Sequence, residues 1–272
     1  MTEQQTRAET FRALHTSDEP IVLVNAWDVA SARIIEAAGA RAVATTSAGV
    51  AWSLGAQDGD TLARTLAVDL VRRIVEAVAV PVTADIESGF GTTPDEVGET
   101  VRAVLDVGAV GVNIEDALHG GPPALRDVDE QCARLRAARS VAEDAGVPLY
   151  VNARVDTYLR GLGGLAETVA RADAYLAAGA DGIFVPGVVD PDLVAQLVAR
   201  IPAPVNILAG PGAPPIPELA KLGVRRVSLG SSVAEAAYGV ARRVAEESYD
   251  TGTYDSLAGG VDFGEVNALM GR

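Results

Sequence analysis

A regular alternation of strand-like and helix-like segments most limits the folds open to this chain. Eight short segments rich in Val, Ile, Leu and Ala are separated by helical stretches. They begin near Ile21, Ala42, Val82, Val110, Leu149, Gly182, Val205 and Arg226. Strands that alternate with helices form parallel sheets, because right-handed crossovers return the chain to the same end of the sheet. The pattern therefore predicts an α/β fold with eight parallel strands.

The residues that enter these segments alternate in kind. Proline precedes the odd-numbered strands, and glycine, just past a helix, precedes the even-numbered ones: Pro20, Pro81, Pro148 and Pro204, then Gly39, Gly108, Gly179 and Gly223. Proline is tolerated at the start of a strand, and glycine suits a left-handed helix C-cap. The alternation fits a closed (β/α)8 TIM barrel, whose odd and even strands supply different interior layers. A doubly wound open sheet is the alternative, disfavoured by the lack of G-x-G-x-x-G after the first strand.

The chain of 272 residues is within the length range of one such barrel. We expect a single domain over residues 1–272, with a leading helix in residues 1–19 and a helical tail in residues 249–272. The apolar face of that tail must pack on this barrel or on a neighbouring subunit. Between Leu62 and Val78 an apolar residue recurs at every fourth position, which predicts a helix with one apolar stripe.

The composition limits the partners. The net charge of −15 argues against nucleic acid and anionic membranes. Cys132 is the single cysteine, so an internal disulfide and a thiolate zinc cluster are excluded. The first residues lack a signal-peptide pattern, and no run approaches the roughly 18 to 20 apolar residues of a membrane helix. These features predict a cytoplasmic protein.

Acidic side chains follow the third predicted strand. Asp85 and Glu87 are two residues apart and would project to the same side if strand geometry persists that far. Paired carboxylates with little positive charge beside them suit a hard cation such as Mg²⁺. A solvated acidic turn is the alternative for this motif alone.

Other strand ends carry further polar groups where a barrel places its active site. They include Glu115 with Asp116, Arg154 with Asp156, Asn206 and Ser228. One arginine facing three acids fits a metal together with an anionic substrate. Alternatively, Glu115 and Asp116 cap the following loop, and Arg154 forms a structural ion pair.

Five segments together resemble the signature of the isocitrate lyase/phosphoenolpyruvate mutase superfamily. They are Thr46-Ser47-Ala48-Gly49, Leu54-Gly55-Ala56-Gln57-Asp58, Ala84-Asp85-Ile86-Glu87-Ser88-Gly89-Phe90-Gly91, Ile114-Glu115-Asp116 and Ala153-Arg154-Val155-Asp156. The resemblance implies a (β/α)8 barrel whose C-terminal helical segment is swapped between subunits of a homodimer or homotetramer. It also implies Mg²⁺ and a small carboxylate substrate that passes through an enolate while a C–C or P–C bond breaks or forms.

The same resemblance assigns roles by position. Asp85, Glu87 and Glu115 would hold Mg²⁺, partly through water, with support from Asp58. The substrate carboxylate would lie at Ser47 and the N–H groups of Ala48 and Gly49, and Arg154 would neutralise the enolate oxygen. Asn206, at the end of the seventh strand, is a further candidate for substrate binding.

The loop after the fourth strand departs from the superfamily pattern. Residues 117–123 contain neither the lysine and cysteine of the isocitrate lyases nor the lysine and asparagine of the phosphonate mutases. His119 is the one residue of this loop that can exchange a proton near neutral pH, and a surface histidine without function is the alternative. Cys132 lies beyond the loop and is expected to pack as a small apolar residue.

The resulting expectation is a Mg²⁺-dependent lyase that cleaves a C–C bond, by retro-aldol reaction or decarboxylation, in a small 2-oxo or 2-hydroxy polycarboxylate. One alternative is a P–C bond enzyme such as a phosphonopyruvate hydrolase or a phosphoenolpyruvate mutase. Another is a barrel that binds a metal and an oxo acid without turnover.

Overall fold

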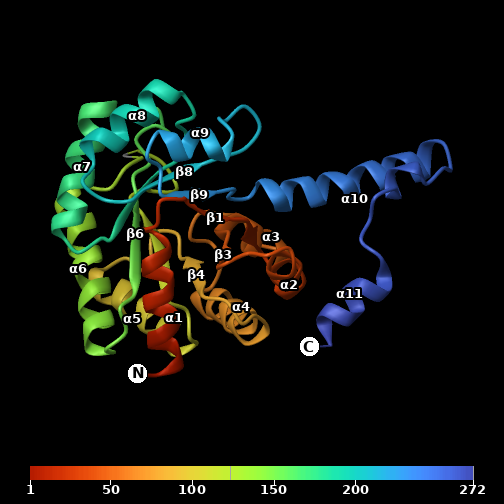
Figure 1. Cartoon of the computed structure of the whole chain (residues 1–272), viewed down its shortest axis with the longest axis horizontal. Helices are drawn as coiled ribbons and strands as arrows, with labels where there is room; N and C mark the ends of the chain where they lie inside the picture. The colour runs from red at the N-terminus through yellow and green to blue at the C-terminus, as the bar shows by residue number, and fades with distance from the viewer. Residues whose placement is uncertain (123, 272) are drawn as a thin grey trace.

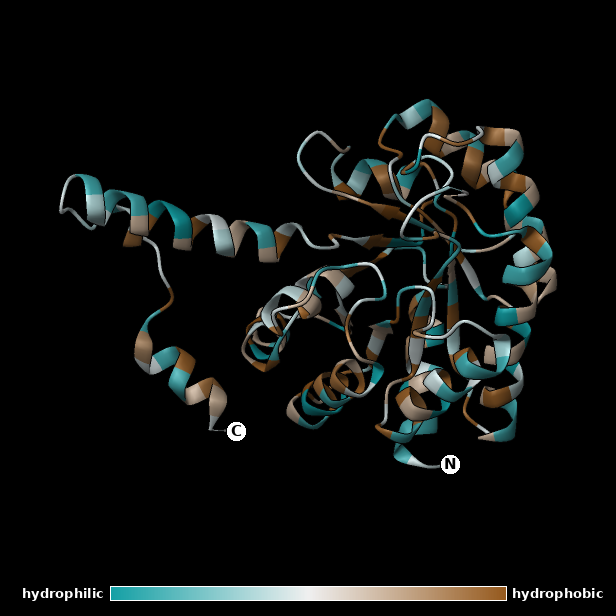
Figure 2. Ribbon diagram, turned by 180° about the vertical axis from the view of Figure 1, so that it is seen from behind, coloured by the Kyte–Doolittle hydropathy of each residue, from teal (hydrophilic) through white to brown (hydrophobic). Residues whose placement is uncertain are grey.

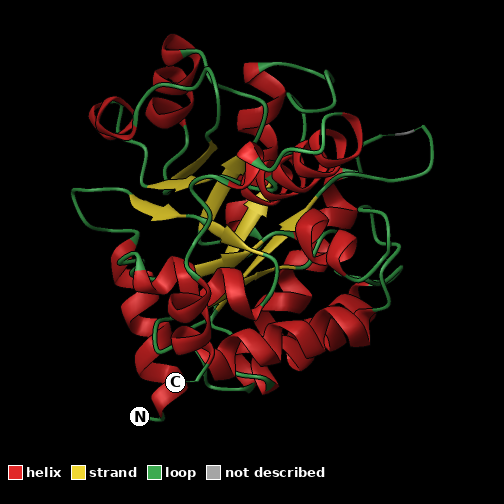
Figure 3. Ribbon diagram, turned by 90° about the vertical axis from the view of Figure 1, so that its right-hand side faces the viewer, coloured by secondary structure: helices red, strands yellow, loops and turns green. Residues whose placement is uncertain are grey.

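The computed structural model describes residues 1–122 and 124–271, and its strands form one parallel sheet (Figure 3). The strand order is β1-β9-β8-β7-β6-β5-β4-β3-β2. The bounds are β1 Ile21–Leu23, β2 Asn25–Ala26, β3 Val43–Thr45, β4 Val82–Asp85, β5 Gly111–Glu115, β6 Tyr150–Arg154, β7 Gly182–Val185, β8 Val205–Leu208 and β9 Arg226–Ser228. Only Val24 separates β1 from β2, so the two edge segments are halves of one strand and the barrel is nearly closed. The predicted (β/α)8 barrel is confirmed.

Helices surround these strands in Figure 3. Their bounds are α1 Glu3–Leu14, α2 Val29–Ala37, α3 Ser47–Ser53, α4 Arg64–Ala77, α5 Pro94–Asp106, α6 Val128–Asp144, α7 Leu165–Ala177, α8 Pro191–Arg200, α9 Ile216–Lys221, α10 Ser232–Asp250, the 3₁₀ turn η1 Asp255–Leu257 and α11 Phe263–Met270. The glycines before β3, β5, β7 and β9, the even-numbered strands of the eight-strand sequence pattern, have positive φ, between 88° at Gly223 and 106° at Gly179. The predicted left-handed helix ends are therefore confirmed.

The leading helix α1 closes the amino-terminal end of the barrel. Phe11 is fully buried, and a Cβ added at Gly111, the first residue of β5, would lie 2.8 Å from its ring. His15, just past α1, stacks on Tyr150 at the start of β6, with 3.8 Å between the ring centroids. The predicted leading helix thus fills the end of the barrel opposite the carboxyl ends of the strands.

The apolar stripe predicted on α4 is wrong at one position. Leu66 is 50% exposed, whereas Ala67, Leu70 and Ile74 are buried. A step of four residues advances by 400°, so a strict every-fourth pattern turns gradually away from the core. The buried set instead follows the mixed three- and four-residue spacing of an amphipathic helix.

The C-terminal segment leaves the barrel. Helix α10 projects outward, and α11 turns back toward α2, where Arg33 donates a hydrogen bond to the carbonyl of Leu269 (Figures 1 and 2). The segment exposes large apolar side chains, among them Tyr249, Tyr254, Leu257, Val261 and Phe263. Among the described helices, none has the length and apolar character to cross a membrane.

Candidate active site

The strand register places Glu115 beside Arg154 at the carboxyl ends of β5 and β6. Nη1 of Arg154 lies 2.6 Å from Oε2 of Glu115, and its Nε lies 2.6 Å from Oδ1 of Asp156. The Glu115 and Asp156 side chains are buried, and Arg154 is 16% exposed. The structure therefore contains the ion pair that the sequence left as a structural alternative, and it places that pair at the rim of the barrel.

The chain turns sharply after β4, so Asp85 and Glu87 do not project as strand neighbours. The strand ends at Asp85, and Glu87 has the left-handed φ of 53°. Asp85 accepts hydrogen bonds from the backbone N–H groups of Glu87 (3.3 Å) and Ser47 (3.4 Å). Glu87 accepts hydrogen bonds from the N–H groups of Gly59 (2.8 Å) and Asp60. The two carboxylates are thus held by separate loops.

The acidic side chains at this rim are hard to keep ionised without a cation. Burial raises the pKa of Asp85 and Glu115, although the positive charge of Arg154 opposes both shifts. Burial raises the pKa of Glu87 to about 8, and the negative charges of Asp58, Asp60 and Asp85 contribute. Carboxylates desolvated beside one another are stabilised by a hard divalent cation. The donor set therefore fits Mg²⁺.

Two ligand sets are candidates: the predicted set of Asp85, Glu87 and Glu115, and a second set that converges in the structure. One potential ligand atom from each of Asp60, Glu87 and His119 lies within 4.8 Å of the other two. Among the described residues, Asp85 and Glu115 do not complete such a group with Glu87. Asp60 was missed by the sequence analysis, and its signal was the Asp58-Gly59-Asp60 run, of which only the first acid was chosen. Glu87 belongs to both sets.

His119 lies over the acidic cluster. Its Nε2 is 2.8 Å from Oε1 of Glu115, and its Nδ1 is 3.3 Å from Nη2 of Arg160. The hydrogen bond to Glu115 raises the pKa of His119. The loop after β5 therefore brings a titratable ring to the rim, as the predicted acid or base role requires.

The other predicted residues lie at different depths. Ser47, Ala48 and Gly49 form the first turn of α3, and the backbone N–H of Ser47 donates a hydrogen bond to Asp85. Asp58 is exposed and close enough to raise the pKa of both Asp85 and Glu87.

Asn206 lies inside the barrel, below the rim. It is fully buried, and its amide bonds to Asn152, to Ser228 and to the carbonyls of Ile207 and Arg226. Asp116 likewise accepts hydrogen bonds from Tyr175 and Arg171. The structure thus does not bring Asn206 together with the other candidate residues. Asp116 is held by two side chains of α7.

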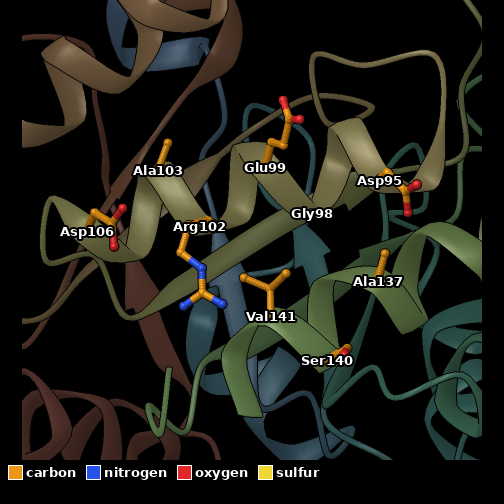
Figure 4. Close-up of a pocket in the computed structure, with 9 residues that line it drawn as sticks. All are labelled: Asp95, Gly98, Glu99, Arg102, Ala103, Asp106, Ala137, Ser140 and Val141. Carbon is orange, nitrogen blue, oxygen red and sulfur yellow. The ribbon is translucent and has the colours of Figure 1, made fainter. Parts of the chain in front are cut away.

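A separate pocket of about 600 Å³ lies between α5 and α6 on the outer layer (Figure 4). A Cβ at Gly98 would lie 3.4 Å from Val141, an ordinary van der Waals contact between the two helices. Arg102, Glu99 and Asp106 line it without the convergent buried acids of the strand ends. This pocket therefore does not belong to the candidate active site.

The sequence profile of the phosphoenolpyruvate phosphomutase family matches residues 11–249. Because the match covers most of the chain, the protein belongs to this family. Its relatives include an uncharacterized protein and enzymes that catalyse different reactions.

An uncharacterized protein of Mycobacterium tuberculosis is 42% identical over 224 residues, covering 82% of each chain. The 2-methylisocitrate lyase of Escherichia coli is 29% identical over 205 residues, which is 72% of this chain and 68% of the lyase. The oxaloacetate decarboxylase of Paraburkholderia xenovorans is 29% identical over 234 residues, covering 84% of this chain and 76% of the decarboxylase.

Solved structures show the same fold. A Burkholderia cenocepacia protein provisionally described as a lyase/mutase has a TM-score of 0.95 and 38% identity, over 100% of this chain and 98% of the other. A phosphonopyruvate hydrolase complex with oxalate and Mg²⁺ has a TM-score of 0.85 and 26% identity, over 97% of this chain and 95% of the other. The chain is thus similar to enzymes of the phosphoenolpyruvate mutase/isocitrate lyase superfamily.

Proposed function

We propose that this protein is a Mg²⁺-dependent lyase that cleaves a C–C bond in a small 2-oxo or 2-hydroxy polycarboxylate. The observation that carries the proposal is the Arg154–Glu115 pair at the barrel rim, beside buried acids of raised pKa. The site combines a fixed cation with carboxylates that favour a second, divalent cation. Two positive charges of this kind suit a reaction in which an enolate forms beside a carboxylate.

The reaction class follows from where negative charge develops. When the carbon next to a carbonyl loses its other carbon neighbour and keeps the electron pair of that bond, the resulting enolate carries a concentrated charge on oxygen. Groups that stabilise this charge more than the ketone of the substrate accelerate the reaction. A bound Mg²⁺ would act as a Lewis acid toward that oxygen.

The roles of the chain's own residues follow the family pattern. Asp85, Glu87 and Glu115 would hold the cation, with Asp58 or Asp60 in support, and Arg154 would contact the enolate oxygen. Ser47, Ala48 and Gly49 would contact the substrate carboxylate. His119 is our candidate for the proton donor to the enolate carbon, which keeps the electron pair of the broken bond, because it is the titratable side chain of the loop after β5 that contacts Glu115.

Decarboxylation of an oxaloacetate-like acid fits this site well, because it needs enolate stabilisation but no cysteine acid. The loop after β5 lacks that cysteine, and a relative over 84% of this chain is an oxaloacetate decarboxylase. A P–C bond enzyme is the second candidate, supported by the family's mutase and by the neighbouring phosphonopyruvate hydrolase. A barrel that binds oxo acid and metal without turnover is the third.

A turnover screen followed by proton NMR separates these candidates. The panel is oxaloacetate, isocitrate, 2-methylisocitrate, 2-alkylmalates and phosphonopyruvate, each with and without Mg²⁺, with Arg154→Ala as the blank. We expect pyruvate or succinate from a C–C substrate with the wild type only. Turnover of phosphonopyruvate alone would replace the proposal with the P–C enzyme, and oxalate binding without any turnover would replace it with the binding protein.

A further inference from the structure

Arg160 is held beside the candidate site by a fixed stretch of backbone. It lies in the loop between β6 and α7, where its N–H donates to the carbonyl of Asp156 at 2.9 Å. The preceding residue, Leu159, packs so closely on Gly187 that a Cβ there would lie 3.0 Å from the Leu159 nitrogen. The Arg160 side chain is exposed, so the loop anchors the backbone and leaves the guanidinium free to reach a ligand.

The contact between Arg160 and His119 brings the guanidinium to the acidic cluster. A guanidinium N–H can only donate, so Nδ1 of His119 accepts from Nη2 of Arg160 at 3.3 Å. The ring proton is then on Nε2, which faces Oε1 of Glu115 at 2.8 Å. The imidazole ring therefore bridges Glu115 and Arg160.

Arg160 differs from the neighbouring arginines in its unused hydrogen-bond donors. Arg154 is paired with Glu115 and Asp156, and Arg126 lies 2.5 Å from Glu130. Arg134 donates to the carbonyls of Ser88, Gly91 and Thr92. Within residues 1–122 and 124–271, no carboxylate lies within ion-pair distance (4.0 Å) of Arg160, and His119 is its side-chain partner.

An unpaired arginine at this rim has a chemical consequence for the substrate. The rim carries several carboxylates and the chain has a net charge of −15, so a doubly anionic substrate is repelled unless local cations offset that charge. Arg154 is already paired with both Glu115 and Asp156, and its single positive charge offsets only one of these two carboxylates. Arg160 supplies a planar guanidinium, which matches a carboxylate in shape and charge.

We infer that Arg160 binds the distal carboxylate of the substrate, the one remote from the 2-oxo or 2-hydroxy group, and so selects dicarboxylates over monocarboxylates. This inference rests on the proposed function, because it assumes that the metal and Arg154 hold the reacting end. On ligand binding, Arg160 exchanges its weak contact with His119 for the carboxylate. His119 is then released from one of its two partners.

Isothermal titration calorimetry in saturating Mg²⁺ tests the inference with two matched ligands. These are 3,3-difluorooxaloacetate and 3,3-difluoropyruvate, which differ by the distal carboxylate, and oxalate reports on the metal half of the site. The variants are Arg160→Gln, Arg160→Lys and, as matched control, Arg136→Gln on the exposed face of α6.

We expect the wild type to bind difluorooxaloacetate at least about 10-fold more tightly than difluoropyruvate, as one charged hydrogen-bonded contact provides. Arg160→Gln should lose about 10- to 100-fold in affinity for difluorooxaloacetate and stay within about twofold for the other two ligands. Arg160→Lys should retain part of the preference, and Arg136→Gln all of it.

Equal wild-type affinity for the two difluoro ligands would overturn the inference. So would an equal loss for all three ligands in Arg160→Gln, since Arg160 would then support the loop rather than contact the distal group. If oxalate does not bind the wild type, the proposed function itself is contradicted, and not only the role of Arg160.

Discussion

Nη1 of Arg154 lies 2.6 Å from Oε2 of Glu115, across adjacent strand ends of the barrel. Glu115 is 4% exposed, so Arg154 rather than water is the main partner of this carboxylate. Arg154 is fixed from its other side by Asp156. The guanidinium is therefore positioned before any substrate arrives, which is the arrangement that electrostatic catalysis requires.

Arg154→Lys should lower kcat by about 10²- to 10³-fold, the usual cost of removing one preorganised donor to a developing oxyanion. Lysine keeps the charge but loses the planar fork that bridges Glu115 and Asp156. Steady-state kinetics on the substrate found by NMR checks this. An unchanged kcat, with the thermal midpoint also unchanged, would contradict the role of Arg154.

Glu87→Gln should weaken divalent metal binding about 10- to 100-fold, whichever ligand set holds the ion. Electron paramagnetic resonance titration with Mn²⁺ measures this without reference to activity. Glu99→Gln, an exposed acid on α5, is the matched control. Asp85→Asn and Asp60→Asn then separate the two ligand sets, and we expect the larger loss from Asp85→Asn. Mn²⁺ binding by Glu87→Gln at wild-type strength would contradict the proposed site.

His15 should make the protein less stable in acid. Burial, and then the positive charge of Arg226, lower its pKa from 6.5 to about 3, while its contact with Phe11 acts in the opposite direction and Arg12 adds a smaller lowering effect. Below pH 6.5 His15 is protonated in the unfolded chain but stays neutral in the folded protein. Stability is therefore complete above pH 6.5 and falls as the pH drops toward 3.

This one group should account for about 2 kcal/mol of lost unfolding free energy between pH 7 and pH 5. Urea unfolding at both pH values, for the wild type and for His15→Gln, isolates the contribution as the difference between the two pH dependences. Equal pH dependences would show that His15 is not neutral in the fold.

Gly182→Ala should destabilise the barrel by about 1–3 kcal/mol, because the added Cβ would lie 2.3 Å from the Tyr150 hydroxyl oxygen. That hydroxyl has no hydrogen-bond partner among the described residues. Tyr150→Phe alone should therefore be nearly neutral, and it should recover most of the loss caused by Gly182→Ala. Thermal unfolding of the two single variants and the double variant tests this, and additive losses would contradict it.

The C-terminal segment leads us to propose that the protein is a homodimer or homotetramer in which the arm, residues 249–271, exchanges its contact with α2 of its own chain for a second subunit. The arm exposes Phe263 (81%) and Tyr249 (90%). A groove of about 870 Å³ between α2 and α9 presents the matching apolar wall, with Val22, Ile34 and Ile216. We expect deletion of residues 251–272 to reduce the mass measured by light scattering to that of one chain. A wild-type monomer at micromolar concentration would exclude the proposal.

The barrel could be predicted because its signals are local. Strand segments, glycine helix ends and the leading helix depend on residues adjacent in sequence, and the structure has them where the pattern indicated. The stripe on α4 failed at Leu66 because a helix does not repeat every four residues.

The candidate site could be predicted only in part, because loops set its geometry. Glu115 and Arg154 followed from strand register, but Glu87 is turned by N–H groups of Gly59 and Asp60, 28 and 27 residues away in sequence. Arg160 carries no local motif, and its place beside His119 depends on a contact across 41 residues. Contacts between residues so far apart in sequence leave no local sequence pattern from which they could be predicted.

Calorimetric titration of oxalate, a planar dianion that mimics the pyruvate enolate, tests the central claim most directly. The wild type should bind oxalate in the presence of Mg²⁺ and at least about 100-fold more weakly in EDTA, and Arg154→Ala should lose about 10- to 100-fold with Mg²⁺ present. Binding that is indifferent to Mg²⁺ or to Arg154 would contradict a site built to stabilise an enolate between a divalent cation and this arginine.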